Sequence, residues 1–69
     1  MQVSAVLMVA EEGGYIAYNP ETGTTTQGET LEEALDNLRE ATGVYLEEFP
    51  STEPAASPLL TTIQVPVHA

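Results

Sequence analysis

The side chains best suited to chemistry in this sequence are carboxylates, six of which form three adjacent pairs, Glu11-Glu12, Glu32-Glu33 and Glu47-Glu48. Carboxylates that converge can hold a metal ion or act as general acids and bases. Adjacent side chains, however, point in different directions in a strand or a helix, so such a pair does not converge on one ligand. We therefore expect no enzyme, with no catalytic residues, no cofactor and no metal site.

The other reactive side chains favour the same interpretation. His68 is the one histidine and lies beside the chain end, where a frayed terminus is expected rather than a base or ligand. Tyr15, Tyr18 and Tyr45 suit packing with their hydroxyls in water. The absence of cysteine excludes a disulfide and the usual structural zinc site. The enzyme alternative requires hydrolytic activity that is lost when Glu11 or Glu12 is mutated.

The charge of the chain narrows the class of partner. The sequence has eleven acidic side chains and one basic side chain, Arg39, which gives a net charge of −10. Proteins that bind nucleic acid neutralise phosphates with Lys and Arg, so we expect no direct binding to DNA or RNA. A basic partner fits better, and the alternative is that acidity only keeps a small domain soluble. The apolar run 5–10 is too short to span a membrane and no basic region precedes it, so we expect a cytoplasmic protein.

The elements that would position these residues begin with a meander of three strands. Residues 2–11, 15–18 and 24–27 are rich in β-branched or apolar side chains. Gly13-Gly14 suits a tight hairpin turn because glycine tolerates positive φ. The run 19–23, Asn-Pro-Glu-Thr-Gly, has the residue types of a second turn.

A helix is predicted next, from Leu31 to Phe49. Thr30 and Glu33 form a capping box, and Pro50 ends the helix. Gly43 should weaken the helix by about 1 kcal/mol unless it marks a close packing contact. An apolar stripe at three- and four-residue spacing faces the sheet; its members are Leu31, Ala34, Leu35, Leu38, Ala41, Thr42, Tyr45 and Phe49.

A final strand is predicted after a Pro-rich linker at residues 50–58. From residue 61 onward polar and apolar side chains alternate, with Ile63, Val65 and Val67 on one face. Pro66 cannot donate to a ladder, so this strand should lie at a sheet edge. The fold class is therefore α+β, a single domain over 1–69 with the order β-β-β-α-β: a three-stranded antiparallel meander, one amphipathic helix on one face, and the final strand.

A series of short motifs in this order resembles the HicB family, the antitoxin halves of bacterial toxin–antitoxin pairs. The resemblance spans roughly two-thirds of the chain and implies a partial ribonuclease H-like fold. It also implies that the protein covers a small basic RNA-cleaving toxin called HicA. The motifs are Ala17-Tyr18-Asn19-Pro20, Gly23, Thr26-Gln27-Gly28-Glu29-Thr30, Glu32-Glu33-Ala34, Asn37, Glu40-Ala41 and Tyr45-Leu46.

Two departures from that family limit the expectation. Many members continue into a DNA-binding segment, whereas this sequence stops at Ala69 without a basic stretch, so autoregulation through DNA is not expected. The turn at 21–24 also lacks the hydrophobic and cysteine residues often found in relatives. Partner contact is expected on the acidic helix face, through Glu32, Asp36, Glu40, Glu47 and Glu48.

Self-association is a further expectation. A chain of 69 residues buries only about 60% of its unfolded surface, so its core is thin and association adds what is missing. We expect at least a dimer. The alternative function is a freestanding oligomeric module of the same fold without a toxin.

Overall fold

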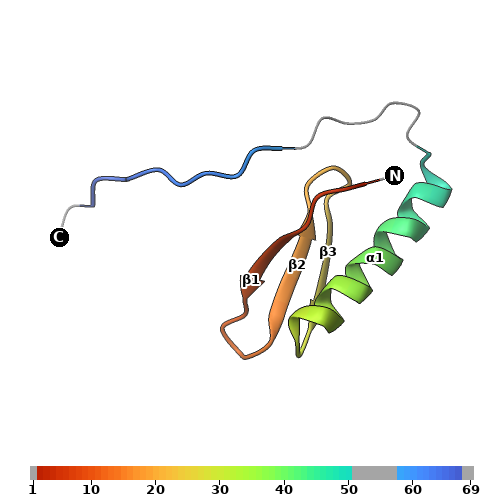
Figure 1. Ribbon diagram of the computed structural model, residues 1–69, viewed down its shortest axis with the longest axis horizontal. Coiled ribbons are helices and arrows are strands. Elements are labelled where there is room, and N and C mark those ends of the chain that lie inside the picture. The colour runs from red at the N-terminus through yellow and green to blue at the C-terminus, as the bar shows by residue number, and fades with distance from the viewer. Residues whose placement is uncertain (1, 51–57, 68–69) are drawn as a thin grey trace.

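The computed structural model describes residues 2–50 and 58–67, which form a three-stranded sheet with one helix on one face (Figure 1). The strands lie in the order β1-β2-β3, and each neighbouring pair is antiparallel. The predicted meander followed by one helix is confirmed. The elements are β1 Val6–Val9, β2 Tyr15–Asn19, β3 Thr24–Gly28 and α1 Leu31–Glu48.

The first hairpin forms where the glycine pair predicts it. Gly13 and Gly14 both have positive φ, at 104° and 79°. β1 is shorter than the predicted strand 2–11, because the register that pairs Val6 with Tyr18 places residues 4 and 5 opposite the end of β2. Pro20 cannot donate there and begins the next turn, so the ladder stops.

Helix α1 begins with the predicted capping box, with one difference in its geometry. The N–H of Glu33 donates to Thr30 Oγ1 at 3.1 Å. The Glu33 carboxylate accepts from the N–H of Glu29 at 3.2 Å, one residue before the N-cap. At the other end the N–H of Phe49 donates to the carbonyl of Tyr45 at 2.8 Å, and Pro50 follows.

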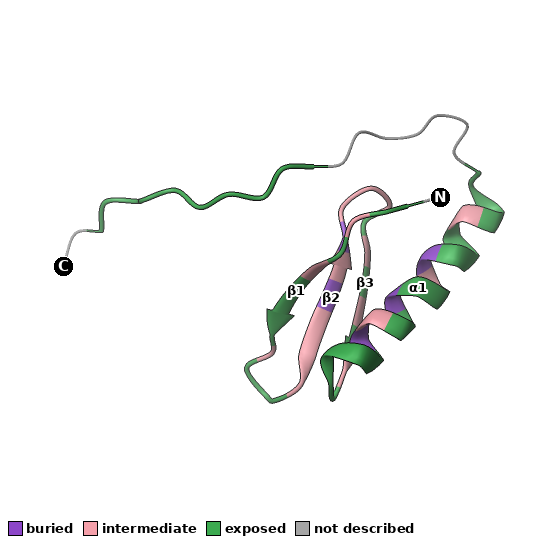
Figure 2. Ribbon diagram, in the orientation of Figure 1, coloured by how far each residue is buried: buried purple, intermediate pink, exposed green. Residues whose placement is uncertain are grey.

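The core lies between the middle of α1 and strands β2 and β3. Ala17, Ala34 and Leu38 are buried, with Tyr15 packed against them (Figure 2). Small side chains at Ala17 and Ala34 let the helix backbone approach the sheet closely. Thr26 Oγ1 donates to the carbonyl of Ala34 at 3.0 Å, which joins β3 directly to the helix.

The apolar stripe of α1 is buried only in its middle. Ala34, Leu38 and Thr42 are buried, whereas Tyr45 and Phe49 are 39% and 60% exposed. The reason is geometric, because α1 is inclined to the strands and its C-terminal end moves away from the sheet (Figure 1). Among the described residues, no atom other than those of the local helix backbone and adjacent residues lies within 4 Å of a Cβ built at Gly43. Gly43 therefore marks no close packing contact, and the helix continues through it to Glu48.

The final strand is not present in this single chain. Residues 58–67 have no strand assignment, and their apolar side chains are exposed (Figure 2). Residues 51–57 of the predicted linker lie outside the described residues. Across 2–50 and 58–67, no helix is both long and apolar enough to cross a membrane.

Candidate partner-binding surface

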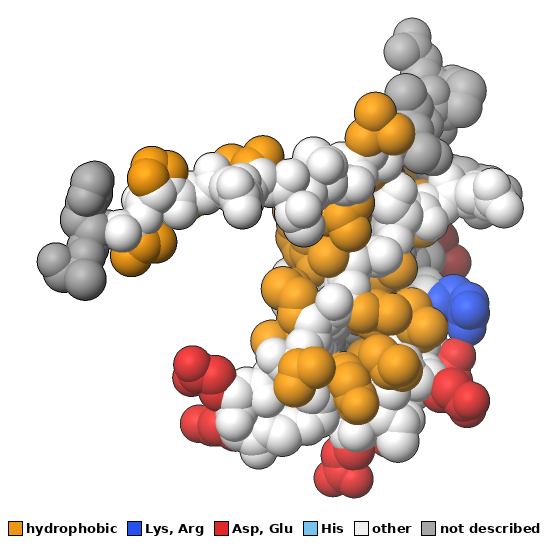
Figure 3. Space-filling model, turned by 60° about the vertical axis from the view of Figure 1, so that its left-hand side comes forward, with side chains coloured by type: hydrophobic (Ala, Val, Ile, Leu, Met, Phe, Trp, Pro, Cys, Tyr) orange, Lys and Arg blue, Asp and Glu red, His pale blue; other side chains and the backbone are white. Residues whose placement is uncertain are grey.

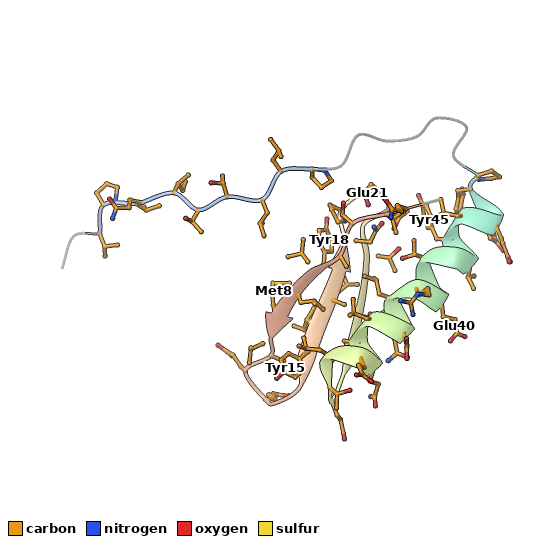
Figure 4. The ribbon with its side chains drawn as sticks, in the orientation of Figure 1. Met8, Tyr15, Tyr18, Glu21, Glu40 and Tyr45 are labelled. Atoms are coloured by element: carbon orange, nitrogen blue, oxygen red, sulfur yellow. The ribbon has the colours of Figure 1, made fainter. Side chains whose placement is uncertain are left out.

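The predicted partner-binding residues lie on the side of α1 that faces away from the sheet. Glu32, Asp36, Glu40 and Glu47 are spaced by four, four and seven residues, which aligns them along one face of an α-helix. All are exposed, and Glu40 points outward in Figure 4. We call these four residues the acidic face. Glu48 is also exposed but lies about 100° around the helix from Glu47, so it stands beside this face.

One cation lies next to the acidic face. Arg39 donates to Asp36 at 2.7 Å, with both side chains more than 70% exposed. A surface pair of this kind contributes about 0–1 kcal/mol. Arg39 is the only Lys or Arg of the sequence, so no second side chain of this kind exists to neutralise Glu32, Glu40 or Glu47.

The carboxylate pairs of the described residues lie in separate parts of the structure. Among the described residues, no three His, Cys, Asp or Glu side chains lie close enough together to hold a metal ion. Glu11 and Glu12 lie in the exposed turn between β1 and β2. Glu33 is occupied by the helix cap. His68 lies outside the described residues.

The three tyrosines lie in different surroundings. Tyr15 packs against the core, and alternation along β2 places Tyr18 on the opposite face of the sheet. Tyr45 stacks against Phe49, with ring centroids 5.0 Å apart. Each therefore contacts apolar surroundings or solvent, as the sequence predicts for packing groups.

A hydrogen-bonded cluster around Asn19 is the structural feature that the sequence does not predict. Asn19 is fully buried, and its Nδ2 donates to the Ser4 carbonyl and to the Glu21 carboxylate, each at 2.7 Å. Its Oδ1 accepts from the N–H of Thr22 at 2.8 Å and from the Thr22 hydroxyl at 2.6 Å. This Asn19 cluster joins the segment before β1 to the turn between β2 and β3.

Glu21 completes the cluster from the edge of the turn (Figure 4). Its carboxylate accepts from the N–H of Ser4 at 2.6 Å. This backbone hydrogen bond from Ser4, assisted by the Asn19 amide, lowers the pKa of Glu21 below its ordinary value of 4.5. An Asn before a Pro signals a turn, but nothing in the sequence signals a contact across 15 residues to Ser4. The cluster positions the segment that leads into β1.

A groove runs between the segment before β1 and α1. Thr42 is 3% exposed, and its Oγ1 has no hydrogen-bond partner among the described residues. This polar atom is the only buried one of its kind in the part of the chain described. The groove is lined by Gln2, Val3, Ser4, Ala5, Leu35, Leu38, Arg39 and Thr42.

Comparison with known proteins identifies the family of this chain. No curated protein and no solved structure matches the chain significantly. One family matches residues 2–66, which span nearly all of the 69-residue sequence. The protein therefore belongs to the family described as "Family of unknown function (DUF7387)".

Proposed function

We propose that the protein is a HicB-like antitoxin, which binds and neutralises a small basic RNA-cleaving toxin through protein–protein contact. The observation that carries the proposal is the acidic face of α1, where four exposed carboxylates line one side of the helix and only Asp36 pairs with the single cation, Arg39. The meander followed by a helix supports it as well, because the family that the sequence motifs resemble has the same order of elements.

The acidic face is not required for the fold. Its carboxylates lie opposite the buried residues of α1, and the Asp36–Arg39 pair is a weak surface contact. Like charges at four-residue spacing destabilise a helix by about 0.2–0.5 kcal/mol per pair. Residues that lower stability and contribute no packing are typical of a binding surface. The negative electrostatic potential of a chain with net charge −10 would attract a basic partner to it.

The rest of the proposal concerns architecture and partners. The fold is β-β-β-α-β, with the final strand formed by the alternating residues of 61–67 once they are paired. The partner is a HicA-like toxin and not nucleic acid, and the protein acts in the cytoplasm as at least a dimer. A second candidate, a freestanding oligomeric module without a toxin, is favoured by the exposed apolar residues near the C-terminus.

The test begins with the candidate toxin, a short Lys- and Arg-rich protein encoded next to this chain. Binding is measured by calorimetry at rising salt, and inhibition is measured by RNA cleavage. The variant Glu40→Gln/Glu47→Gln removes two charges from the acidic face. The control Glu11→Gln/Glu12→Gln removes two charges from the turn before β2, so both variants have the same net charge.

We expect the helix variant to lose at least about tenfold in affinity, chiefly through slower association, and the turn variant to lose much less. Affinity of the original pair should fall as salt screens the charges. Equal losses of affinity in the two variants would mean that only the net charge matters and not the acidic face. The absence of toxin binding at low salt would favour the second candidate, the freestanding module.

A further inference from the structure

The described residues near the C-terminus form an apolar segment without a partner. We call residues 58–67 the C-terminal segment. Leu59, Ile63 and Val67 are 96%, 80% and 87% exposed, and the segment extends away from the sheet (Figure 1). Apolar side chains in an alternating pattern are typical of a strand that is covered on one face. The exposed segment therefore has the sequence of a strand and lacks a sheet to join.

The outer edge of β1 offers the backbone groups that such a strand requires. The N–H of Ala10 donates to the carbonyl of Gly14 at 3.0 Å, so Ala10 directs its backbone groups toward β2. Direction alternates along an antiparallel strand, which places the N–H and C=O groups of Leu7 and Val9 on the outer side. No described residue forms a strand beside this edge.

The side chains of β1 are also left open. Helix α1 covers β2 and β3, and Leu7, Met8 and Val9 of β1 are 39%, 46% and 78% exposed. In Figure 3, hydrophobic side chains gather over the middle of the molecule and along the C-terminal segment, and the carboxylates lie at the margins. An apolar edge with unpaired backbone groups is a template for another strand.

Charge indicates which molecule can approach this edge. All eleven acidic side chains lie between residues 11 and 53, so neither 2–10 nor 54–67 contains a charged side chain. Two copies with net charge −10 repel each other over most of their surfaces. The β1 edge and the C-terminal segment are thus two regions where copies can meet without opposing carboxylates. A basic partner would gain no attraction there.

We propose that the C-terminal segment of one copy pairs with the outer edge of β1 in a second copy, and that the second copy returns the same contact. Each sheet then gains its fourth strand from the partner, and the dimer has twofold symmetry. Ile63, Val65 and Val67 share one face of the added strand, and Pro66 ends its ladder on one side.

Pairing with a second copy is favoured over a return to the same chain by the course of the C-terminal segment. Residues 58–67 extend away from the sheet of their own chain (Figure 1), and their apolar side chains are exposed. A segment that leaves its own sheet in this way suits exchange between two copies.

The inference does not rest on the proposed antitoxin function, because it uses the β1 edge and not the acidic face. The two contacts also respond to salt in opposite directions. Salt screens the repulsion between two acidic copies and strengthens the dimer, whereas it weakens a complex between acidic and basic proteins. Failure of one proposal is therefore distinguishable from failure of the other.

The first test is the mass of the full chain in solution by light scattering, with Val65→Asp as the disrupting variant. Gln64→Asp is the matched control, because it adds the same charge to the adjacent residue on the other face of the strand. We expect a dimer for the original chain and for Gln64→Asp. The dimer dissociation constant of Val65→Asp should rise roughly 100-fold, about tenfold for each of the two symmetric contacts.

The second test uses the absence of cysteine in the chain. One preparation has Leu7→Cys, another of different tag length has Ile63→Cys or Val65→Cys, and the two are mixed and oxidised. A disulfide that joins one long and one short chain supports the exchange. A monomeric original chain, the absence of a disulfide between one long and one short chain, or an unchanged dimer in Val65→Asp would overturn it.

Discussion

Gly28 is the position where a single methyl group should have the largest effect on the fold. A Cβ built at Gly28 would lie 2.4 Å from the N of Ala34, 2.8 Å from the C of Glu33 and 2.9 Å from the Cα of Ala34. All three atoms belong to the helix backbone, which cannot rotate aside. Carbon atoms in contact prefer about 3.5–4.0 Å. The variant Gly28→Ala must therefore move the first turns of α1 away from β3 by about 1 Å.

The cost of this movement follows from the contacts that it stretches. Overpacking of a tight site costs about 1–3 kcal/mol. The hydrogen bonds Thr26 Oγ1 to the carbonyl of Ala34 and Asn37 Nδ2 to the carbonyl of Gln27, at 3.0 and 2.8 Å, join the same two elements. Each contributes about 0.5–1.5 kcal/mol. We expect Gly28→Ala to lower the free energy of unfolding by about 2–5 kcal/mol, a large part of the total for a chain of this length.

Gly43→Ala is the matched control because it makes the same chemical change in an open position of the helix. Among the described residues, no atom other than those of the local helix backbone and adjacent residues lies within 4 Å of the added Cβ. Alanine in a helix interior is favoured over glycine by about 0.5–1 kcal/mol, so this variant should gain stability. Thermal unfolding followed by circular dichroism at one protein concentration compares the two. For a domain of this size, about 1 kcal/mol corresponds to about 4–8 °C in Tm.

The expected result is a fall in Tm of at least about 10 °C for Gly28→Ala and a rise of a few degrees for Gly43→Ala. A Gly28→Ala protein that unfolds within about two degrees of the original chain would refute the close approach of β3 to α1. A loss of stability in Gly43→Ala would show instead that this face of the helix is covered in solution, and would remove that position as a control.

Three further predictions concern polar groups. Asn19→Ala removes four hydrogen bonds of a fully buried amide and should lower the free energy of unfolding by about 2–4 kcal/mol, measured by urea denaturation. Thr42→Val removes a buried hydroxyl that has no hydrogen-bond partner among the described residues, so it should raise the free energy of unfolding by up to about 1 kcal/mol in the same urea measurement. A lower free energy of unfolding in this variant would mean that the hydroxyl forms a hydrogen bond in solution. The pKa of Glu21 is lowered in the folded state from 4.5, so its contribution is present above pH 4.5 and is lost as the pH falls through the folded pKa. The stability difference between the original chain and Glu21→Gln should therefore narrow below pH 4.5, and a difference that is constant with pH would contradict this.

The local features of the fold could be predicted from the sequence because each depends on a few neighbouring residues. Gly13 and Gly14 adopt the positive φ that a hairpin turn requires. Thr30 is the N-cap of α1, as its three-residue spacing to Glu33 predicts. The acidic face was also predictable, because it follows from helical spacing alone. Its role as a binding surface stays a prediction.

The features that depend on tertiary placement could not be predicted. The apolar stripe of α1 gives no sign that Tyr45 and Phe49 would lie outside the buried part, because their burial depends on the inclination of the helix to the sheet. The Asn19 cluster requires a partner at Ser4 that belongs to another segment. The pairing of the final strand depends on a second molecule in our proposal, and a single sequence does not contain that information.

The outward-facing backbone of β1 has a consequence for amide hydrogen exchange. The amide of Met8 points into the ladder with β2, whereas the amides of Leu7 and Val9 point to the outside. One short strand thus holds slowly and rapidly exchanging positions side by side. Slow exchange of the Leu7 amide, close to the rate of Met8, would indicate that the outer edge is occupied by another strand.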